Sequence, residues 1–364
     1  MPSEKMLMNG SHTVGEAAVR AGCRYYFGYP ITPQNELPEY LSSRMQDVGG
    51  TFIQGESEVA SINMVLGASV AGGRTMTSSS SPGISLKQEG ISYMAGMELP
   101  AVIINMMRGG PGLGNIAPSA ADYFQATRGG GHGDYRTPVL APAGGQELAD
   151  LTFVAFDLAD KYRNPVMLLG DGLMGQVMEP VVFPDFIDLE SLPKKDWKLD
   201  GCKGREPRAL YSMLLGQQGE LYKHNLHLHE KYDRITAEEQ RWETKNTDDT
   251  EVVIVAYGTA ARIAESATEE LEADGIQAGL FRPITLWPFP LPALRELSQK
   301  VPKIAVFELS MGQMVEDVIL SVGERAEIYF HGLPGGIIPT PADVAGFIRS
   351  VVKGDGTVGR RIDV

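Results

Sequence analysis

The sequence predicts an α/β protein with two parallel-sheet domains joined by a polar connector. Short apolar runs bounded by Gly, Pro or Asn alternate with stretches of helical spacing, over residues 1–190 and again over residues 249–364. Residues 191–248 interrupt that alternation with polar and charged sequence. A chain of 364 residues with 43% apolar content is long enough to bury two cores.

The first domain contains apolar runs of the kind that form buried parallel strands. We expect these strands at Arg24–Tyr29, Thr51–Gln54, Ala101–Met107, Thr137–Ala141 and Pro165–Leu169. Helical spacing of apolar residues predicts helices over Gln146–Lys161 and after Glu58, the latter rich in small residues that allow close packing. The run Thr77–Gly83 lacks the ending of a phosphate-binding loop, and we interpret it as a turn whose serines cap the next helix.

The connector and the second domain follow. No clear strand is predicted over residues 191–248, where we expect one or two helices. In the second domain, strand and helix alternate again, as in a second parallel sheet. The predicted strands there are Val252–Tyr257, Gln277–Phe281, Lys303–Glu308 and Glu327–His331.

Composition narrows the function class. A net charge of −14 disfavours nucleic acid and anionic membranes as partners, since both repel an acidic surface. The two cysteines are too few for an iron–sulfur cluster, which takes about four thiolates. The sequence contains neither a signal-peptide core nor an apolar run approaching the ~20 residues of a membrane span. We therefore expect a soluble, cytoplasmic protein.

Three motifs end apolar runs of the first domain and begin Gly- or Pro-containing turns. They are Gly28-Tyr29-Pro30-Ile31-Thr32-Pro33, Gly55-Glu56-Ser57-Glu58 and Arg108-Gly109-Gly110-Pro111-Gly112. We expect all three at the carboxyl ends of neighbouring strands, where open α/β sheets bind ligands. A hydroxyl, a carboxylate and a guanidinium that converge there would suit an anionic substrate and an ionisable cofactor ring.

In this order the motifs resemble the α subunit of the 2-oxoacid:ferredoxin oxidoreductases, and the resemblance runs through nearly the whole chain. It is strongest for the branch that acts on 2-oxoisovalerate, which shares the run from Gly55 to Gly67 and the segment Gly129–Tyr135. The resemblance implies a thiamine-diphosphate-binding, pyrimidine-type domain over residues 1–190. It also implies a transketolase C-terminal-like domain over residues 249–364, which includes the stretch Arg282–Pro290.

The resemblance assigns Glu58 to cofactor activation, as the carboxylate that shares a proton with the thiamine aminopyrimidine ring. From spacing alone, an acid in a first helical turn is more simply explained by the helix dipole. Glu56 competes for the role, but the family motif places it on the second acid of Glu-x-Glu.

Arg108 and Thr32 are the substrate-binding residues that the resemblance implies. Arg108 would grip the 2-oxo acid carboxylate bidentately, although a structural salt bridge is an equally good explanation from the residue alone. Thr32 would contact the substrate and, with Pro30 and Ile31, lie next to the thiamine cofactor. Without the resemblance, a threonine that bonds its own backbone in the turn is favoured.

Other parts of the cofactor site are missing from this chain. Gly170-Asp171-Gly172 resembles a Mg²⁺–diphosphate motif, but no asparagine occurs from Leu173 to His224, so we interpret Asp171 as a helix cap. The resemblance then places the diphosphate and Mg²⁺ on a β subunit. It places [4Fe–4S] clusters on partners, with γ and ferredoxin-like δ subunits, ferredoxin and coenzyme A completing the set. No metal is predicted here, and we interpret His224, His227 and His229 as a solvated helix face.

The expected reaction is oxidative decarboxylation of a 2-oxo acid with coenzyme A to acyl-CoA, CO₂ and reduced ferredoxin. Many family members have hydroxyls after the arginine, whereas this chain has Gly112, Leu113 and Ala117. Loss of polar groups favours a branched apolar substrate over a second carboxylate. The alternatives are 2-oxoglutarate, pyruvate or an aryl glyoxylate as substrate, or a non-catalytic assembly subunit.

The isolated chain is expected to show no iron–sulfur absorbance and no oxidation of 2-oxo acids, because it lacks both the cysteine ligands and the diphosphate motif. Visible spectroscopy and a dye-reduction assay on the purified chain check this. A visible band of the [4Fe–4S] type in the single chain would contradict it.

Overall fold

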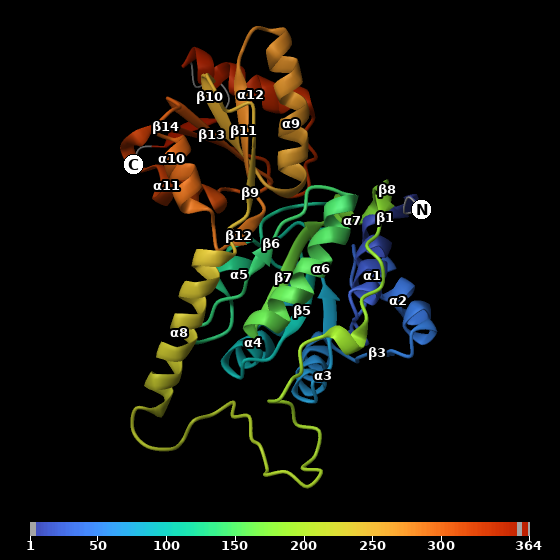
Figure 1. Cartoon of the computed structure of the whole chain (residues 1–364). Coiled ribbons are helices and arrows are strands. Elements are labelled where there is room, and N and C mark those ends of the chain that lie inside the picture. Colours follow the sequence, from blue (N-terminus) through green and yellow to red (C-terminus); the bar gives the residue numbers. More distant parts are fainter. Residues whose placement is uncertain (1–4, 355–358, 363–364) are drawn as a thin grey trace.

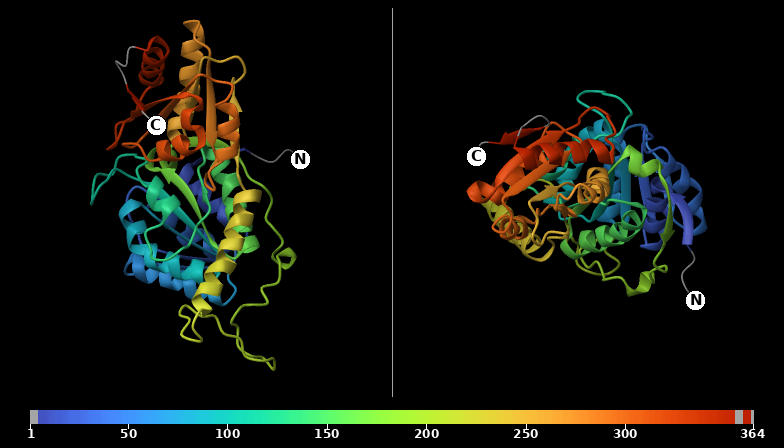
Figure 2. Two further views of the ribbon diagram at one scale, coloured as in Figure 1. Left: turned by 90° about the vertical axis from the view of Figure 1, so that its left-hand side faces the viewer. Right: turned by 90° about the horizontal axis from the view of Figure 1, so that it is seen from above.

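The computed structural model describes residues 5–354 and 359–362. The first domain, coloured from blue to green, contains one large sheet. The second domain, coloured orange and red, contains a second sheet and packs against one end of the first domain (Figures 1 and 2). Between them in the chain, the segment after η1 (Leu189–Ser191) leaves the body as an extended loop before α8 (Glu220–Glu238) returns along the first domain (Figure 1).

The first sheet has seven strands in the order β12-β6-β7-β5-β4-β2-β3. All neighbouring pairs are parallel except β12–β6, and the strands β4, β5 and β7 are buried along their whole lengths. The strands are β2 (Tyr25–Gly28), β3 (Thr51–Gln54), β4 (Thr75–Ser79), β5 (Ala101–Met107), β6 (Val139–Leu140), β7 (Pro165–Asp171) and β12 (Thr285–Trp287).

Helices cover this sheet, and a short antiparallel ribbon of β1 (Lys5–Asn9) and β8 (Met178–Val182) lies beside it. The helices α1 and α6 pack against each other, as do α3 and α4. The helices are α1 (Gly10–Arg20), α2 (Glu36–Asp47), α3 (Glu58–Val70), α4 (Ser81–Gly96), α5 (Tyr123–Arg128), α6 (Gly145–Tyr162) and α7 (Gly172–Gln176).

The second sheet has six strands in the order β15-β14-β13-β10-β11-β9, with a parallel centre and an antiparallel strand at each edge. Its strands are β9 (Trp242–Lys245), β10 (Val252–Val255), β11 (Ala278–Pro283), β13 (Lys303–Glu308), β14 (Glu327–Gly332) and β15 (Arg360–Ile362). Its helices are α9 (Gly258–Ala273), α10 (Leu291–Leu297), α11 (Met314–Val322), η2 (Gly323–Arg325) and α12 (Pro341–Lys353).

Buried polar contacts join the two domains. The strand β12 leaves the second domain to pair with β6 of the first sheet. The hydroxyl of Tyr257 donates to the carbonyl of Ala120 at 2.9 Å. The carboxylate of Asp317 accepts from the Tyr123 hydroxyl and, at 2.8 Å, from Arg128. These contacts fix the second domain above the carboxyl edge of the first sheet (Figure 1).

Most predicted elements are present, and β3, β5 and β13 have the predicted bounds. Two predictions were wrong. The Thr77–Gly83 run does not form a turn capped by serine side chains, because Thr75–Ser79 is strand β4 and the side chain of Ser80, the N-cap of α4, makes no capping bond. The connector was expected to contain no strand, but β9 lies at its end, where it pairs with β11. Both segments are polar, and their pairing depends on distant strands.

The predicted domain boundaries near residues 190 and 248 remain predictions. Strand β9, from the predicted connector, joins the second sheet, and strand β12, from the predicted second domain, joins the first sheet. Within the described ranges 5–354 and 359–362, no helix is long and apolar enough to cross a membrane.

Candidate active site

The three predicted motifs lie at one edge of the first sheet. The parallel strands β3, β2, β4 and β5 end there in that spatial order, so β4 separates the turn after β2 from Arg108 after β5. The Gly55 amide donates to the Gly28 carbonyl at 2.9 Å and ties the first two turns together. The strand that sequence reasoning missed therefore lies at the centre of the site.

The turn that contains Thr32 is held from below by buried polar groups. Ser78 of β4 donates to Gln34 Oε1 at 2.6 Å, and its hydroxyl also lies 2.6 Å from the Tyr26 hydroxyl. Gln34 is fully buried, and its amide nitrogen lies 3.5 Å from the Tyr29 carbonyl. This network fixes the path of the backbone from residue 29 to residue 34. The half-buried Thr32 hydroxyl accepts a hydrogen bond from Asn35 at 3.3 Å.

Arg108 lies at the tip of β5 with its side chain 6% exposed. Its Nη1 donates to the Thr32 carbonyl at 2.8 Å, and its Nη2 donates to the Leu113 carbonyl at 3.1 Å. Its Nε is buried without a partner. The guanidinium forms no ion pair in the described part of the chain, so a structural salt bridge does not explain its burial. Ser81 anchors the backbone here, accepting from the Arg108 amide at 3.0 Å.

Glu58 is the first residue of α3, behind the N-cap Ser57, whose hydroxyl oxygen accepts from the Ala60 amide at 3.1 Å. The Glu58 side chain is buried, at 6% exposure, whereas Glu56 is exposed. No described residue donates a hydrogen bond to the Glu58 carboxylate. A buried carboxylate without a donor is costly, which indicates a group that meets a ligand.

Two glycines of α4 allow the close packing of α3 and α4 around this carboxylate. A Cβ on Gly83 would lie 2.7 Å from Glu58 Oε1 and 2.0 Å from Ser79 Oγ. One on Gly90 would lie 2.6 Å from Cγ2 of Ile62, one turn after Glu58. The close packing therefore favours glycine, rather than alanine, at both α4 positions.

These residues fit the pyrimidine half of thiamine diphosphate. The Glu58 carboxylate could share a proton with a ring nitrogen, and the Ser79 hydroxyl near it is buried without a partner among the described residues. The structure brings Thr32 and Arg108 into direct contact, whereas Glu58 lies next to Gly83 near the start of α4. Pro30 is exposed and Ile31 is half-buried in the same turn. Their roles toward a cofactor or substrate remain predictions.

Sequence reasoning missed Gln34, Ser78 and Ser81, which hold the site from below. The available signal was the segment between two predicted strands that is rich in hydroxyl residues, four of which occupy buried positions of the five-residue strand β4. Polar side chains at such positions require partners.

Asp171 and His224, which were not predicted to bind a metal, both contact backbone groups of the fold. Asp171 caps α7, because its carboxylate accepts from the amides of Leu173 and Met174 at 3.0 and 3.1 Å. His227 and His229 are exposed on α8 as predicted, but His224 is half-buried, with Nε2 2.7 Å from the Gly96 carbonyl. Across residues 5–354 and 359–362, no group of three or more metal-binding side chains is assembled.

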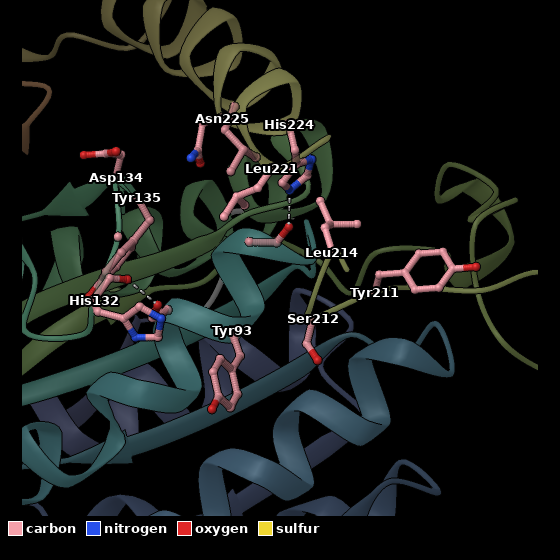
Figure 3. A pocket seen from close by; sticks show the side chains of 14 residues that line it. Tyr93, His132, Asp134, Tyr135, Tyr211, Ser212, Leu214, Leu221, His224 and Asn225 are labelled. Carbon is pink, nitrogen blue, oxygen red and sulfur yellow. Dashed lines mark hydrogen bonds between the residues drawn. The ribbon is translucent and has the colours of Figure 1, made fainter. Parts of the chain in front are cut away.

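The Gly-rich segment Gly129–Tyr135 packs on α4 away from Glu58. The Gly130 amide donates to Gln88 Oε1 at 2.9 Å, and Ser92 donates to the His132 carbonyl at 2.8 Å. A cavity of about 180 Å³ lies between this segment, α4 and the start of α8 (Figure 3). None of Thr32, Glu58 and Arg108 lines it.

The fold is similar to that of two solved structures, one of an oxidoreductase and one of a transketolase. One solved structure, "2-oxoglutarate:ferredoxin oxidoreductase from Magnetococcus marinus with 2-oxoglutarate, coenzyme A and succinyl-CoA bound", matches 96% of this chain with a TM-score of 0.87 and 24% identity. The present chain spans 66% of that longer chain. A "Split gene transketolase, inactive beta4 tetramer" matches 98% of this chain and all of its own, with a TM-score of 0.58 and 14% identity.

The chain belongs to the 2-oxoacid:ferredoxin oxidoreductase family. The family "Pyruvate flavodoxin/ferredoxin oxidoreductase, thiamine diP-bdg" matches residues 16–246, and "Pyruvate:ferredoxin oxidoreductase core domain II" matches residues 250–344. The ketoisovalerate oxidoreductase subunit VorB of Methanothermobacter thermautotrophicus is 49% identical over 95% of this chain and 97% of its own. The 2-oxoglutarate synthase subunit KorA of Archaeoglobus fulgidus is 38% identical over 86% and 91%, respectively. Both relatives are named as subunits of oxidoreductases or synthases.

Gly83→Ala is expected to lower the stability of the full chain, because the new methyl overlaps Ser79 and Glu58. Overpacking of a buried contact typically costs ~1–3 kcal/mol. Gly96→Ala is the matched control on α4, since a Cβ there meets nothing within 4 Å, and the gain in helix propensity should leave stability equal or higher. Urea unfolding midpoints measure both. Equal midpoints for the two variants would contradict the close contact.

Proposed function

We propose that this chain is the α-type subunit of a thiamine-diphosphate-dependent oxidoreductase that converts 2-oxoisovalerate and coenzyme A to the branched acyl-CoA and CO₂, reducing ferredoxin. The observation that carries the proposal is the buried Glu58 carboxylate without a donor, at the same sheet edge as the Thr32–Arg108 contact. The 49% identity to a ketoisovalerate oxidoreductase subunit supports the substrate.

Glu58 is proposed as the residue that activates the cofactor. Thiamine diphosphate, when bound, supplies the nucleophilic carbon and the electron sink that decarboxylation of a 2-oxo acid requires. The protein contributes a carboxylate fixed at the start of α3, where the helix dipole stabilises its charge. Because none of the described residues donates to that carboxylate, we propose that it holds or releases a proton at a ring nitrogen. Exposure of Glu56 to solvent makes it the weaker candidate.

Arg108 and Thr32 are proposed to hold the 2-oxo acid. Arginine binds a carboxylate through two parallel N–H groups, and Arg108 retains a buried Nε without a partner. The Leu113 carbonyl, which now accepts from Nη2, belongs to an exposed loop and can give way to a substrate carboxylate. The Thr32 hydroxyl lies in the turn whose carbonyl anchors the same guanidinium. Pro30 and Ile31 of that turn would line the cofactor.

The rest of the enzyme is proposed to come from other chains. A β subunit would carry the diphosphate and Mg²⁺, and γ and ferredoxin-like δ subunits would carry the path of electrons to ferredoxin and part of the coenzyme A site. Asp171 is committed to capping α7, which supports a diphosphate site elsewhere. Cys23 is buried and Cys202 exposed, both as free thiols, which suits a reducing cytoplasm.

Glu58→Gln is expected to lower kcat of the assembled complex by ~10²–10⁴-fold, because the amide cannot exchange the proton. Cofactor binding should change little, since the diphosphate would be held by the partner. Glu56→Gln, two residues away but exposed, is the matched control and should keep normal turnover. Turnover, cofactor retention and hydrogen–deuterium exchange at the thiamine C2 are the measurements. Wild-type exchange in Glu58→Gln would refute the role.

A panel of 2-oxo acids tests the substrate, with kcat/KM for 2-oxoisovalerate expected to exceed that for 2-oxoglutarate. Burying a second carboxylate without partners costs several kcal/mol, whereas an isopropyl group gains from burial. Leu113→Thr should raise relative use of 2-oxoglutarate by restoring a hydroxyl beside Arg108. Leu215→Thr, at a connector leucine that is 84% exposed, is the control and should not. A preference for 2-oxoglutarate in the wild-type complex would overturn the substrate but not the reaction.

A further inference from the structure

The face of α4 that packs on α3 carries a lysine between its two glycines. Gly83, Lys87 and Gly90 follow helical spacing, and the two glycines contact Glu58 and Ile62 of α3. Lys87 therefore faces α3 on the same stripe, one turn below the Glu58 contact. Its side chain is fully buried. Lysine is almost never buried to this degree unless paired.

The ammonium of Lys87 has a single hydrogen-bond acceptor in the described part of the chain. Its Nζ donates to Thr77 Oγ1 at 3.0 Å. No carboxylate within residues 5–354 and 359–362 forms an ion pair with it. The ionisable group whose charge acts on it is Glu58. Thr77 and Ser79 alternate with Ser78 on β4, so both point to the face that carries α3 and α4.

Among the described residues, Lys87 is thus a buried cation without an ion-pair partner, and Glu58 is a buried carboxylate without a hydrogen-bond donor. Burial lowers the pKa of Lys87 from its ordinary value near 10.5 to about 8, and the charge of Glu58 opposes that shift. The protonated form is therefore maintained near neutral pH in part by Glu58.

We propose that Lys87 is a positioning residue for Glu58, a buried ammonium held by Thr77 whose positive charge acts on the carboxylate along the α3–α4 contact. The proposal rests on the proposed function of Glu58. Lys87 is fully buried between the Gly83 and Gly90 contacts with α3, so it is proposed to act through its charge at Glu58 rather than by contact with a ligand. In a buried site the field of that charge is only weakly screened.

The first test measures the coupling without turnover. The full chain is labelled with ¹³Cε-lysine, and the Lys87 signal is assigned by its loss in Lys87→Met. In Glu58→Gln, the Lys87 titration should move to lower pH by at least about one unit, as expected for loss of a nearby opposite charge. Lys195, which is mostly buried beside Asp160, should titrate unchanged and serves as the internal control. An unchanged Lys87 titration would overturn the proposal.

The pH dependence of stability distinguishes this role from simple packing. The folded-state pKa of Lys87 lies below the unfolded value, so the unfolded chain binds the extra proton between about pH 8 and 10.5. The Lys87 contribution to wild-type stability should therefore rise with pH across that window, and Lys87→Met should lack that rise. Below pH 8 the variant should be at least as stable as wild type, because it removes a buried charge. A large loss of stability there would indicate a structural lysine and overturn the proposal.

The assembled complex provides the functional readout. Lys87→Met should lower kcat for 2-oxoisovalerate about tenfold or more, leave KM unchanged, and move the acid limb of the kcat–pH profile to higher pH by about one unit. Lys195→Met is the matched control and should alter none of these. Normal kcat and pH profile in Lys87→Met would overturn the proposal. A wild-type complex that oxidises no 2-oxo acid would instead refute the proposed function, and the titration would still report the Lys87–Glu58 coupling.

Discussion

The site depends on a polar strand that is buried in the middle of the first sheet. Every residue of β4 is inaccessible to solvent, although Thr75, Thr77, Ser78 and Ser79 all carry hydroxyls. Alternation along a strand sends these hydroxyls to opposite faces. On one face Ser78 holds the turn of Thr32 through Gln34, and on the other Thr77 receives the Lys87 ammonium. An apolar strand in this place would leave both groups without partners.

Close packing of α3 on α4 places the Glu58 carboxylate near the end of that strand. The contacts that Gly83 and Gly90 make with α3 leave no room for a side chain at either position. The Glu58 side chain therefore packs against α4 and is shielded from water. Shielding strengthens every electrostatic interaction of the carboxylate. The same packing leaves the group without a protein donor, which a stable fold tolerates only where function compensates the cost.

Polar groups at this sheet edge differ in whether their bonding capacity is already used within the described residues. Arg108 satisfies two of its donors on the backbone carbonyls of Thr32 and Leu113 and keeps a third buried without a partner. Asp171, which lies where a diphosphate motif would begin, is bound to the amides of its own helix. These contacts support the proposed division of the site between this chain and partner subunits, and two relatives of the chain are named as subunits.

The sequence by itself determined the alternation of strands and helices and the motifs at the sheet edge. Apolar runs bounded by Gly and Pro are local signals, which is why β3, β5 and β13 could be predicted to the residue. Only the tertiary structure decided that the polar segment Thr75–Ser79 is a central strand, that β12 crosses to the first sheet, and that Glu58 rather than Glu56 is buried. The burial of Lys87 likewise could not be predicted from the spacing of residues along the sequence. Burial of a polar or charged side chain is set by residues distant in the chain, and no local pattern records it.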